Sequence, residues 1–284
     1  MSNKVLRIGQ ISYTNTLPVY FYFDEKQFAD RIDFIQQVPA QLNAAMSQGK
    51  IDVGPISSFS YAEHEENYLV LPELSVSAKG KVRSIFLFSK KPMEQLDGAH
   101  IALTNTSATS VNLGKVILQK FMGFTTTYET MQPTLPMMMS KADAALLIGD
   151  EALLAHRLNR EYYVYDLAEL WNGYTGYSMT FALWTVRKQA ILEQAELLRE
   201  VHAAFLKSKE LSLANVEKVA DYAYTHFGGD PSFWKTYFLG LQYDFTNEQK
   251  EGLEYYYACC ADLGLLSKAV KVSQWENAKP VKTT

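Results

Sequence analysis

The sequence predicts an α/β protein with two lobes, a ligand cleft between the lobes and a helical C-terminal part. Strand and helix signals alternate over residues 4–65, and a second alternating series occupies residues 99–166. Residues 189–263 carry helical patterns alone. Strand–helix–strand order predicts parallel strands with right-handed crossovers, so two such series indicate two sheets. A chain of 284 residues suits one large or two medium α/β units.

The first series begins with short apolar runs, such as Val5, Leu6 and Ile8, that are typical of buried strands. Pro39 stands at the expected start of a helix, where proline is well tolerated. The expected elements are strands at 4–11, 32–37 and 51–53, helices at 16–23, 39–48 and 58–65, and further strands at 69–74 and 84–88.

The second series has the same alternation, and Gly/Tyr-rich residues 171–178 after it are expected to form a connection. The expected elements are strands at 99–104, 124–128, 144–148, 162–166 and 179–186, and helices at 109–121, 135–140 and 151–156. We expect the chain to change lobes near Phe88–Pro92 and again near Tyr177–Phe181. The first lobe would then hold residues 1–90 and 178–284, and the second residues 91–177. A cleft between two lobes is a favoured ligand site.

Composition excludes several classes of function. The net charge of −4 provides no basic field for a phosphate backbone, which disfavours nucleic-acid binding. The adjacent Cys259 and Cys260 are unsuited to a structural disulfide. No apolar stretch is long enough to span a bilayer, and the start of the chain lacks the apolar run of a signal peptide. We therefore expect a cytoplasmic protein with no membrane partner.

Asn15 follows the first expected strand, at a turn into a helix, with Pro18 close behind. In open α/β sheets, ligands bind at such strand-to-helix turns. Asparagine also commonly caps helices. The local pattern leaves both interpretations open.

Residues 105–110 follow the strand at 99–104 and open a helix, and five of these six residues carry a hydroxyl or an amide. A helix N-terminus supplies free N–H groups and a partial positive charge, so the segment is suited to a carboxylate. Thr106, Ser107 and Thr109 are the candidate binding residues. The alternative is a helix cap with more polar groups than it needs.

Five further side chains are candidates with equally plain structural alternatives. Ser57 and Ser58 follow the strand at 51–53. We expect them either to donate hydrogen bonds to a ligand or to cap the next helix. Arg83 is expected either to clamp a carboxylate or to lie in solvent. The neighbouring Ser84 is more favourably placed than Arg83 to face inward. Asp150 ends the strand at 144–148, where it orients a polar group or caps a helix.

No segment has the pattern of a metal or nucleotide site. The five histidines are scattered without metal-ligand spacing, and the sequence has no P-loop, GxGxxG or nucleophile elbow. We accordingly expect no metal and no cofactor.

Taken together, the motifs resemble those of the chorismate dehydratase family, the first enzymes of the futalosine route to menaquinone. The resemblance covers nearly the whole chain, in order. It is carried by Gly9-x-Ile11-x-Tyr13-x-Asn15-x-x-Pro18, Asp52-Val53-Gly54-x-Ile56-Ser57-Ser58, Val82-x-Ser84-Ile85-x-Leu87-Phe88-Ser89, Leu103-Thr104-x-x-Ser107-x-Thr109-Ser110, Ala145-Leu146-Leu147-Ile148-Gly149-Asp150-x-Ala152-Leu153, Tyr165-Asp166-Leu167 with Trp171 and Thr175-Gly176, Phe181-Ala182-x-Trp184, and Leu253-x-x-Tyr256 near Gly264-Leu265.

The resemblance implies a type II periplasmic-binding-protein fold and the dehydration of chorismate, a small dicarboxylate, without metal or redox cofactor. Asn15 matches the family's key asparagine and would orient the enolpyruvyl carboxylate, which itself takes the ring proton. Ser84, Thr106, Ser107 and Thr109 would hold carboxylates, and Asp150 would make a polar contact. One segment departs from the family: Tyr177-Ser178-Met179-Thr180 stands where members often carry a Leu-Pro-Phe-type run, which affects the second crossover and its side of the pocket.

Two other functions fit the same pattern. A solute-binding or sensor protein shares the fold without the chemistry, although the expected lack of an export signal disfavours a transport receptor. The other is the paralogous enzyme that acts later in the futalosine pathway, but the Tyr13-x-Asn15-x-x-Pro18 signature favours the dehydratase. The sequence does not determine the oligomeric state.

Overall fold

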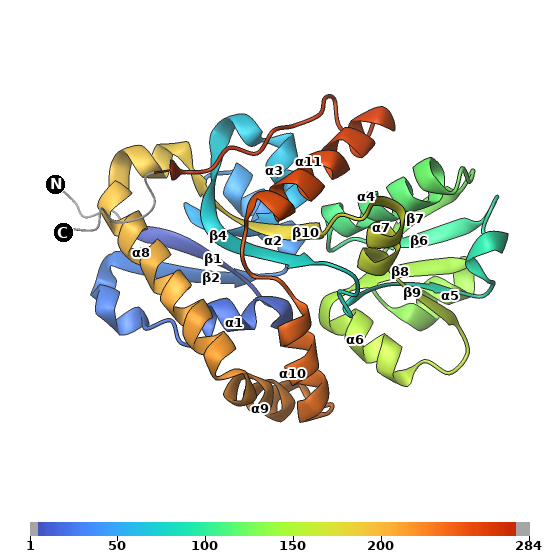
Figure 1. Cartoon of the computed structure of the whole chain (residues 1–284), viewed down its shortest axis with the longest axis horizontal. Coiled ribbons are helices and arrows are strands. Elements are labelled where there is room, and N and C mark those ends of the chain that lie inside the picture. The colour runs from blue at the N-terminus through green and yellow to red at the C-terminus, as the bar shows by residue number, and fades with distance from the viewer. Residues whose placement is uncertain (1–4, 277–284) are drawn as a thin grey trace.

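The computed structural model describes residues 5–276, which form two lobes lying side by side (Figure 1). The first lobe is built on a mixed five-stranded sheet of order β2-β1-β3-β10-β4. β1 pairs in parallel with β2 and β3, while β10 runs antiparallel to β3 and β4. The strands are β1 (Leu6–Ile11), β2 (Ile32–Gln37), β3 (Val53–Ser57), β4 (Tyr68–Ala78) and β10 (Met179–Arg187).

The second lobe has a five-stranded sheet of order β7-β6-β8-β5-β9. β6 pairs in parallel with β7 and β8, and β5 is antiparallel to β8 and β9. The two sheets confirm the expected two-lobed α/β architecture. Their strands are β5 (Ile85–Ser89), β6 (His100–Thr104), β7 (Thr127–Met131), β8 (Ala144–Ile148) and β9 (Tyr163–Asp166).

The first change of lobe lies earlier than expected. β5 belongs to the second sheet, so the chain crosses between Ala78 and Ile85 and not near Phe88–Pro92. The physical reason is the carboxylate of Asp166, which accepts the backbone N–H groups of Val82 and Arg83 at 3.1 and 2.7 Å and holds this connection to the second lobe. The return crossing immediately before β10 agrees with the expectation.

Short helices cover the two sheets, and one of them differs from the prediction. Residues 171–178 were expected as a connection, but α7 (Leu167–Thr175) includes most of them. Asp166 caps α7 through the backbone N–H groups of Ala168 and Glu169, and Trp171 is fully buried. The other helices are α1 (Leu17–Tyr20), α2 (Pro39–Ser47), α3 (Ser58–Glu63), α4 (Ala108–Lys115, continued by a π-helical turn at Val116–Phe121), α5 (Leu135–Lys141) and α6 (Gly149–Leu158).

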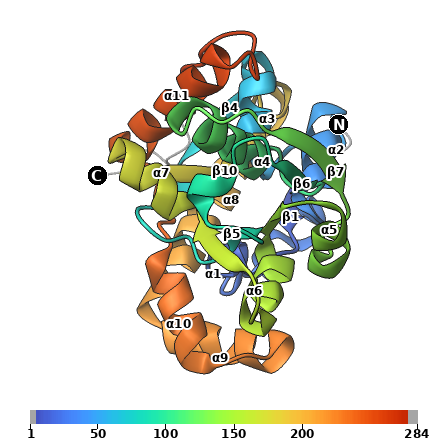
Figure 2. The same ribbon diagram turned by 90° about the vertical axis from the view of Figure 1, so that its right-hand side faces the viewer.

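Four C-terminal helices lie where the sequence predicts them: α8 (Lys188–Ala214), α9 (Val216–Phe227), α10 (Pro231–Gly240) and α11 (Asn247–Asp262). α8 packs on the first lobe, where Phe205 lies against Tyr20 with a ring-centroid distance of 5.3 Å. Figure 2 shows α9 and α10 at one end of the molecule and α11 at the other. These helices therefore flank the junction of the lobes from two sides.

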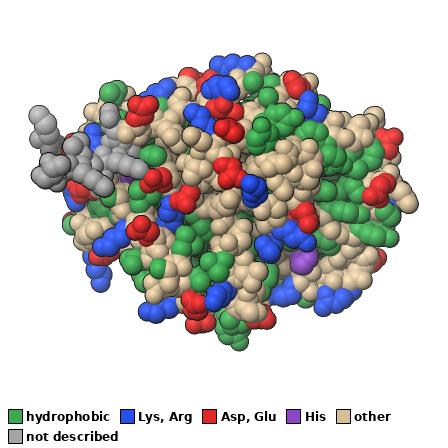
Figure 3. Space-filling view, viewed as in Figure 1, with side chains coloured by type: hydrophobic (Ala, Val, Ile, Leu, Met, Phe, Trp, Pro, Cys, Tyr) green, Lys and Arg blue, Asp and Glu red, His purple; other side chains and the backbone are tan. Residues whose placement is uncertain are grey.

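The surface agrees with the weak net charge. Acidic and basic side chains are interspersed over the face shown in Figure 3. Within residues 5–276, no helix has the length and apolar character needed to cross a membrane.

Candidate active site between the lobes

The loop after β1 meets the start of α6, which brings two candidate segments together across the lobes. The hydroxyl of Thr14 donates to Asp150 Oδ1 at 2.7 Å, and the backbone N–H of Thr14 donates to the same oxygen at 3.3 Å. Asp150 thus bonds to the opposite lobe, and no side-chain cap of α6 is found among the described residues. The capping interpretation of Asp150 is therefore wrong.

Gly149 allows this close approach. Its φ is +62°, and a Cβ at this position would lie 2.8 Å from the ring of Tyr13. A side chain here would be strained and would displace the ring. The Tyr13 hydroxyl is buried beside Thr106 and Glu151 and makes no well-formed hydrogen bond within the described chain. Burial raises the pKa of Tyr13 and keeps the phenol neutral.

Asn15 does not cap a helix. The helical turn Thr14–Thr16 and α1 both begin without a side-chain cap in the described structure. Asn15 Oδ1 is buried and has no hydrogen-bond partner among residues 5–276. A buried acceptor left unpaired costs folding free energy, so it calls for an explanation such as a functional role. The capping interpretation of Asn15 is therefore wrong.

Ser58 and Thr109 meet at the other side of the junction. The Ser58 hydroxyl donates to the carbonyl of Thr180 at 2.7 Å and lies 3.2 Å from Thr109 Oγ1. Thr109 Oγ1 also accepts the backbone N–H of Phe59 at 2.9 Å. Because both side chains are fully buried, their hydroxyls join α3 of one lobe to α4 of the other.

Two tyrosines of α11 support this contact. Tyr256 donates to the carbonyl of Thr109 at 3.0 Å, and Tyr257 donates to the carbonyl of Ser58 at 2.6 Å. Burial raises the pKa of both phenols well above the ordinary value, so they act as neutral donors.

Ser57 and Ser107 both cap helices, as their structural alternatives predicted. Ser57 Oγ accepts the N–H of Ser60 and a hydrogen bond of 2.9 Å from the Asn43 side chain. Ser107 Oγ accepts the N–H of Ser110 at the start of α4. Thr106 lies beside this cap, with its hydroxyl 2.8 Å from that of Thr104.

The side chain of Ser84 faces inward, whereas the side chain of Arg83 lies elsewhere, against α10. Ser84 is 1% exposed and accepts a hydrogen bond of 2.9 Å from Tyr237 of α10. Arg83 has a φ of +61°, and its guanidinium lies against Gly240 and 3.4 Å from the carbonyl of Lys81. Arg83 therefore lies at the first crossover, beside α10.

Electrostatics at the junction favour neutral or tightly bonded groups. Burial raises the pKa of Asp150, and the hydrogen bonds from Thr14 oppose that shift. Burial also raises the pKa of Tyr237; the hydroxyls of Ser84 and Thr14 oppose that shift, and the charge of Asp150 adds to it. Within residues 5–276, no cluster of three or more His, Cys, Asp and Glu side chains is arranged to hold a metal.

One pocket of about 570 Å³ lies at the junction, and its lining includes Asp150. α6 of the second lobe forms one wall and the α9–α10 turn forms the other. The other lining residues are mainly apolar: Leu153, Leu154, His156, Arg157, Phe227, Gly229, Asp230, Phe233 and Trp234. The pocket thus lies directly beside the bond between Thr14 and Asp150.

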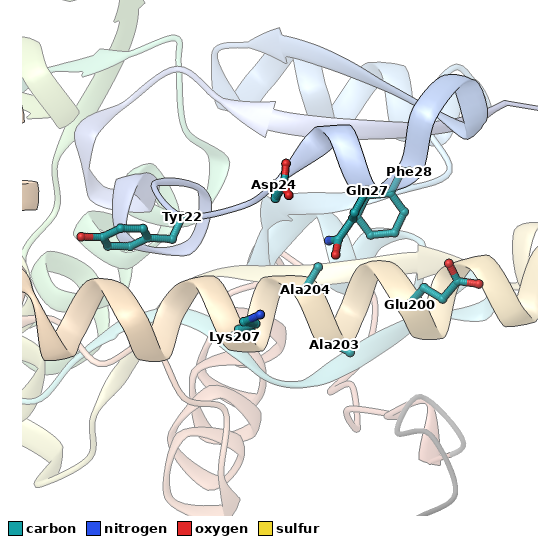
Figure 4. A pocket seen from close by; sticks show the side chains of 8 residues that line it. All are labelled: Tyr22, Asp24, Gln27, Phe28, Glu200, Ala203, Ala204 and Lys207. Carbon is teal, nitrogen blue, oxygen red and sulfur yellow. The ribbon is translucent and has the colours of Figure 1, made fainter.

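A second pocket, of about 370 Å³, lies between α8 and the segment after α1 (Figure 4). Its two acidic groups already have partners: Asp24 accepts the N–H of Lys26, and Glu200 pairs with Arg31. Of the described residues that line it, none is a candidate site residue, so we exclude it from the site.

The structure adds Tyr13, Thr14 and Tyr237 to the predicted site residues. Tyr13 and Thr14 adjoin Asn15 in the first motif, so their position was the available signal. Tyr237 is 153 residues away from Ser84 in sequence, and no local pattern connects the two.

The sequence comparisons agree with this geometry. The pattern of a family described as menaquinone biosynthesis matches residues 6–262, which contain every junction residue described above. The chain belongs to this family. One relative, the chorismate dehydratase of Thermus thermophilus, is 29% identical over 264 residues, covering 87% of this chain and 92% of that protein. The predicted resemblance to this family is confirmed.

Solved structures show how widely the fold is shared. A protein of Archaeoglobus fulgidus superposes with a TM-score of 0.76 at 18% identity, covering 93% of this chain and 99% of that one. The alkanesulfonate-binding protein of Xanthomonas axonopodis has a TM-score of 0.70 at 17% identity, covering 94% and 96%. These similarities confirm the predicted periplasmic-binding-protein-like fold.

Proposed function

We propose that this member of the menaquinone biosynthesis family is a chorismate dehydratase, which removes water from chorismate to give 3-[(1-carboxyvinyl)oxy]benzoate. Membership over residues 6–262 and the Thermus thermophilus relative support this assignment. The single structural observation that supports it most is that the Asn15 amide caps no helix in the described chain.

The reaction is an elimination that needs positioning more than a strong base. The ring proton beside the enolpyruvyl ether is acidic because the ring carboxylate is conjugated with that carbon. Loss of this proton and then of the neighbouring hydroxyl releases one water and leaves an aromatic ring. The substrate's own enolpyruvyl carboxylate takes the proton in this proposal, so alignment provides much of the rate.

Asn15 would donate from its amide nitrogen to the enolpyruvyl carboxylate and hold it over the ring proton. The inward-facing Ser84 and Thr106, with the N-terminal turn of α4, would bind the ring carboxylate. Ser57, Ser107 and Thr109 have hydroxyls engaged in caps or in the contact between lobes, so in this proposal they shape the site. Arg83 takes no part, because it lies against Gly240.

The test is an incubation of purified protein with chorismate, without added metal or nucleotide, followed by mass and ultraviolet spectra. We expect the loss of one water and a new aromatic absorbance. The relatives of known structure include solute-binding proteins, and a binder would leave chorismate unchanged. Unchanged chorismate with demonstrably folded protein would contradict the dehydratase. The expected location of the enzyme is the cytoplasm.

A further inference from the structure

Thr14, Asp150 and Tyr237 come from three separate elements next to Asn15 and Ser84: Thr14 donates to Asp150, and Tyr237 donates to Ser84. We propose that these three side chains form a latch that ties the lobes together and positions Asn15 and Ser84 for turnover. The catalytic part of this inference rests on the proposed function, whereas the structural part does not.

The first half of the latch is the double hydrogen bond from Thr14 to Asp150 Oδ1. Its 2.7 Å O–H···O length is typical of a strong bond to a carboxylate. Thr14 is bonded covalently to Asn15, and the backbone N–H of Thr14 is one of the two donors. The bond therefore sets both the separation of the lobes and the orientation of the backbone that carries Asn15.

The second half is Tyr237, whose hydroxyl donates to Ser84 Oγ at 2.9 Å and lies near Thr14. Ser84 directly precedes β5, at the end of the first crossover. Tyr237 is 1% exposed, so its ring is fixed by the surrounding core. α10 thereby links the crossover segment to the Asn15 loop.

A surface ion pair offers a matched control. Lys120, in the π-helical turn of the second lobe, pairs with Asp262 at the end of α11 at 2.7 Å. This pair joins the same two parts of the molecule but has exposed side chains, and exposed pairs contribute little. Asp262→Asn removes the charge attraction of one ion pair across the junction and leaves the Asn15 loop untouched.

The experiment combines hydrogen exchange with kinetics. Exchange over residues 12–17 is measured without substrate in the wild type, Thr14→Val, Thr14→Ser, Asp150→Ala and Asp262→Asn. We expect at least a tenfold faster exchange in Thr14→Val and Asp150→Ala, near wild-type exchange in Thr14→Ser, and no change in Asp262→Asn. Equal exchange in all five proteins overturns the latch, whatever the substrate of the enzyme is.

The kinetic arm tests positioning. Removing a hydrogen bond to a charged group corresponds to roughly a tenfold to hundredfold loss, which we expect in kcat for chorismate more than in KM. Thr14→Ser keeps the hydroxyl and should keep kcat near the wild-type value, whereas Tyr237→Phe should lower kcat. The double variant Thr14→Val with Asp150→Ala should have a kcat no lower than that of the less active single variant. Additive losses, or an unchanged kcat with accelerated exchange, overturn the positioning role. A wild type that leaves chorismate unchanged refutes the proposed function, and the exchange arm still tests the latch.

Discussion

Asn15 is the residue on which the proposed chemistry depends most, because its amide serves no structural purpose visible among the described residues. Asn15→Ala should abolish the dehydration of chorismate. Since Asn15 caps no helix, the free energy of unfolding should change by less than about 1 kcal/mol, the typical cost of a lost cap. Activity by absorbance and unfolding by urea denaturation test the two halves separately.

The control for this substitution is Asn67→Ala, at an exposed asparagine whose side chain bonds only to the neighbouring Glu66 in the described structure. It should change neither activity nor stability. Retained turnover in Asn15→Ala, or a loss of turnover explained by unfolding, would show that Asn15 is structural.

Asp150 should make stability depend on pH. Burial raises its folded-state pKa above the ordinary 3.8, so ionisation disfavours the folded state. Its contribution to stability is complete below pH 3.8 and declines as the pH rises through the raised value. In Asp150→Asn this decline is absent. The unfolding free energy of the variant minus that of the wild type should therefore increase from pH about 4 towards neutrality, and a constant difference in urea titrations would contradict the burial argument.

For single helices and strands, the local sequence pattern predicted where an element lies in the chain better than it predicted which other elements it pairs with. β2 and β8 begin and end at the predicted residues. In β8 the reason is an apolar run that is buried throughout, which identifies a core strand. β5 was predicted as a strand but assigned to the wrong sheet, since the hydrogen bonds from Val82 and Arg83 to Asp166 join residues more than 80 positions apart. α7 was missed because its Gly and Tyr content is typical of a loop, and its cap and buried Trp171 decide otherwise.

Asp166 is predicted to be the main anchor of the first crossover. Its carboxylate accepts four backbone N–H groups, two from the crossover and two from the start of α7. Asp166→Ala should destabilise the fold by about 2–4 kcal/mol, more than a single lost cap. The matched variant Asp230→Ala removes a cap that accepts the single N–H of Ser232 and should cost about 1 kcal/mol. Equal costs in urea denaturation would refute the anchor.

Gly149 tests the contact between α6 and the loop after β1. Gly149→Ala combines a positive φ with a clash against the Tyr13 ring, while Gly123→Ala has a similar φ of +72° and no described atom within 4 Å of the new methyl group. Gly123→Ala should cost about 1 kcal/mol for backbone strain. Gly149→Ala should cost more and should also lower turnover. A similar loss of stability in both variants would show that the Tyr13 ring moves aside at no cost in free energy, which would contradict the prediction.

At the scale of the whole molecule, the sequence predicted the site better at its strand ends than at its long-range partners. Asn15, Ser58, Thr109 and Asp150 follow the carboxyl ends of strands, which face one another across the two lobes. Ser84 lies at the same edge because it precedes β5, which runs antiparallel to β8. The partners Tyr237 and Tyr256 come from C-terminal helices whose docking depends on tertiary packing alone. The sequence left Arg83 open between a carboxylate clamp and solvent, and its position beside α10 likewise depends on tertiary packing.

The fold itself does not separate an enzyme from a binding protein, since solute-binding proteins of known structure share it at 17% identity or less. The most direct test follows chorismate with the purified wild-type protein and with Asn15→Ala, side by side, by absorbance and mass. The account predicts that the wild type converts chorismate to an aromatic product lighter by one water, and that the folded variant does not. Unchanged chorismate with the wild type, or equal conversion by both proteins, would contradict it.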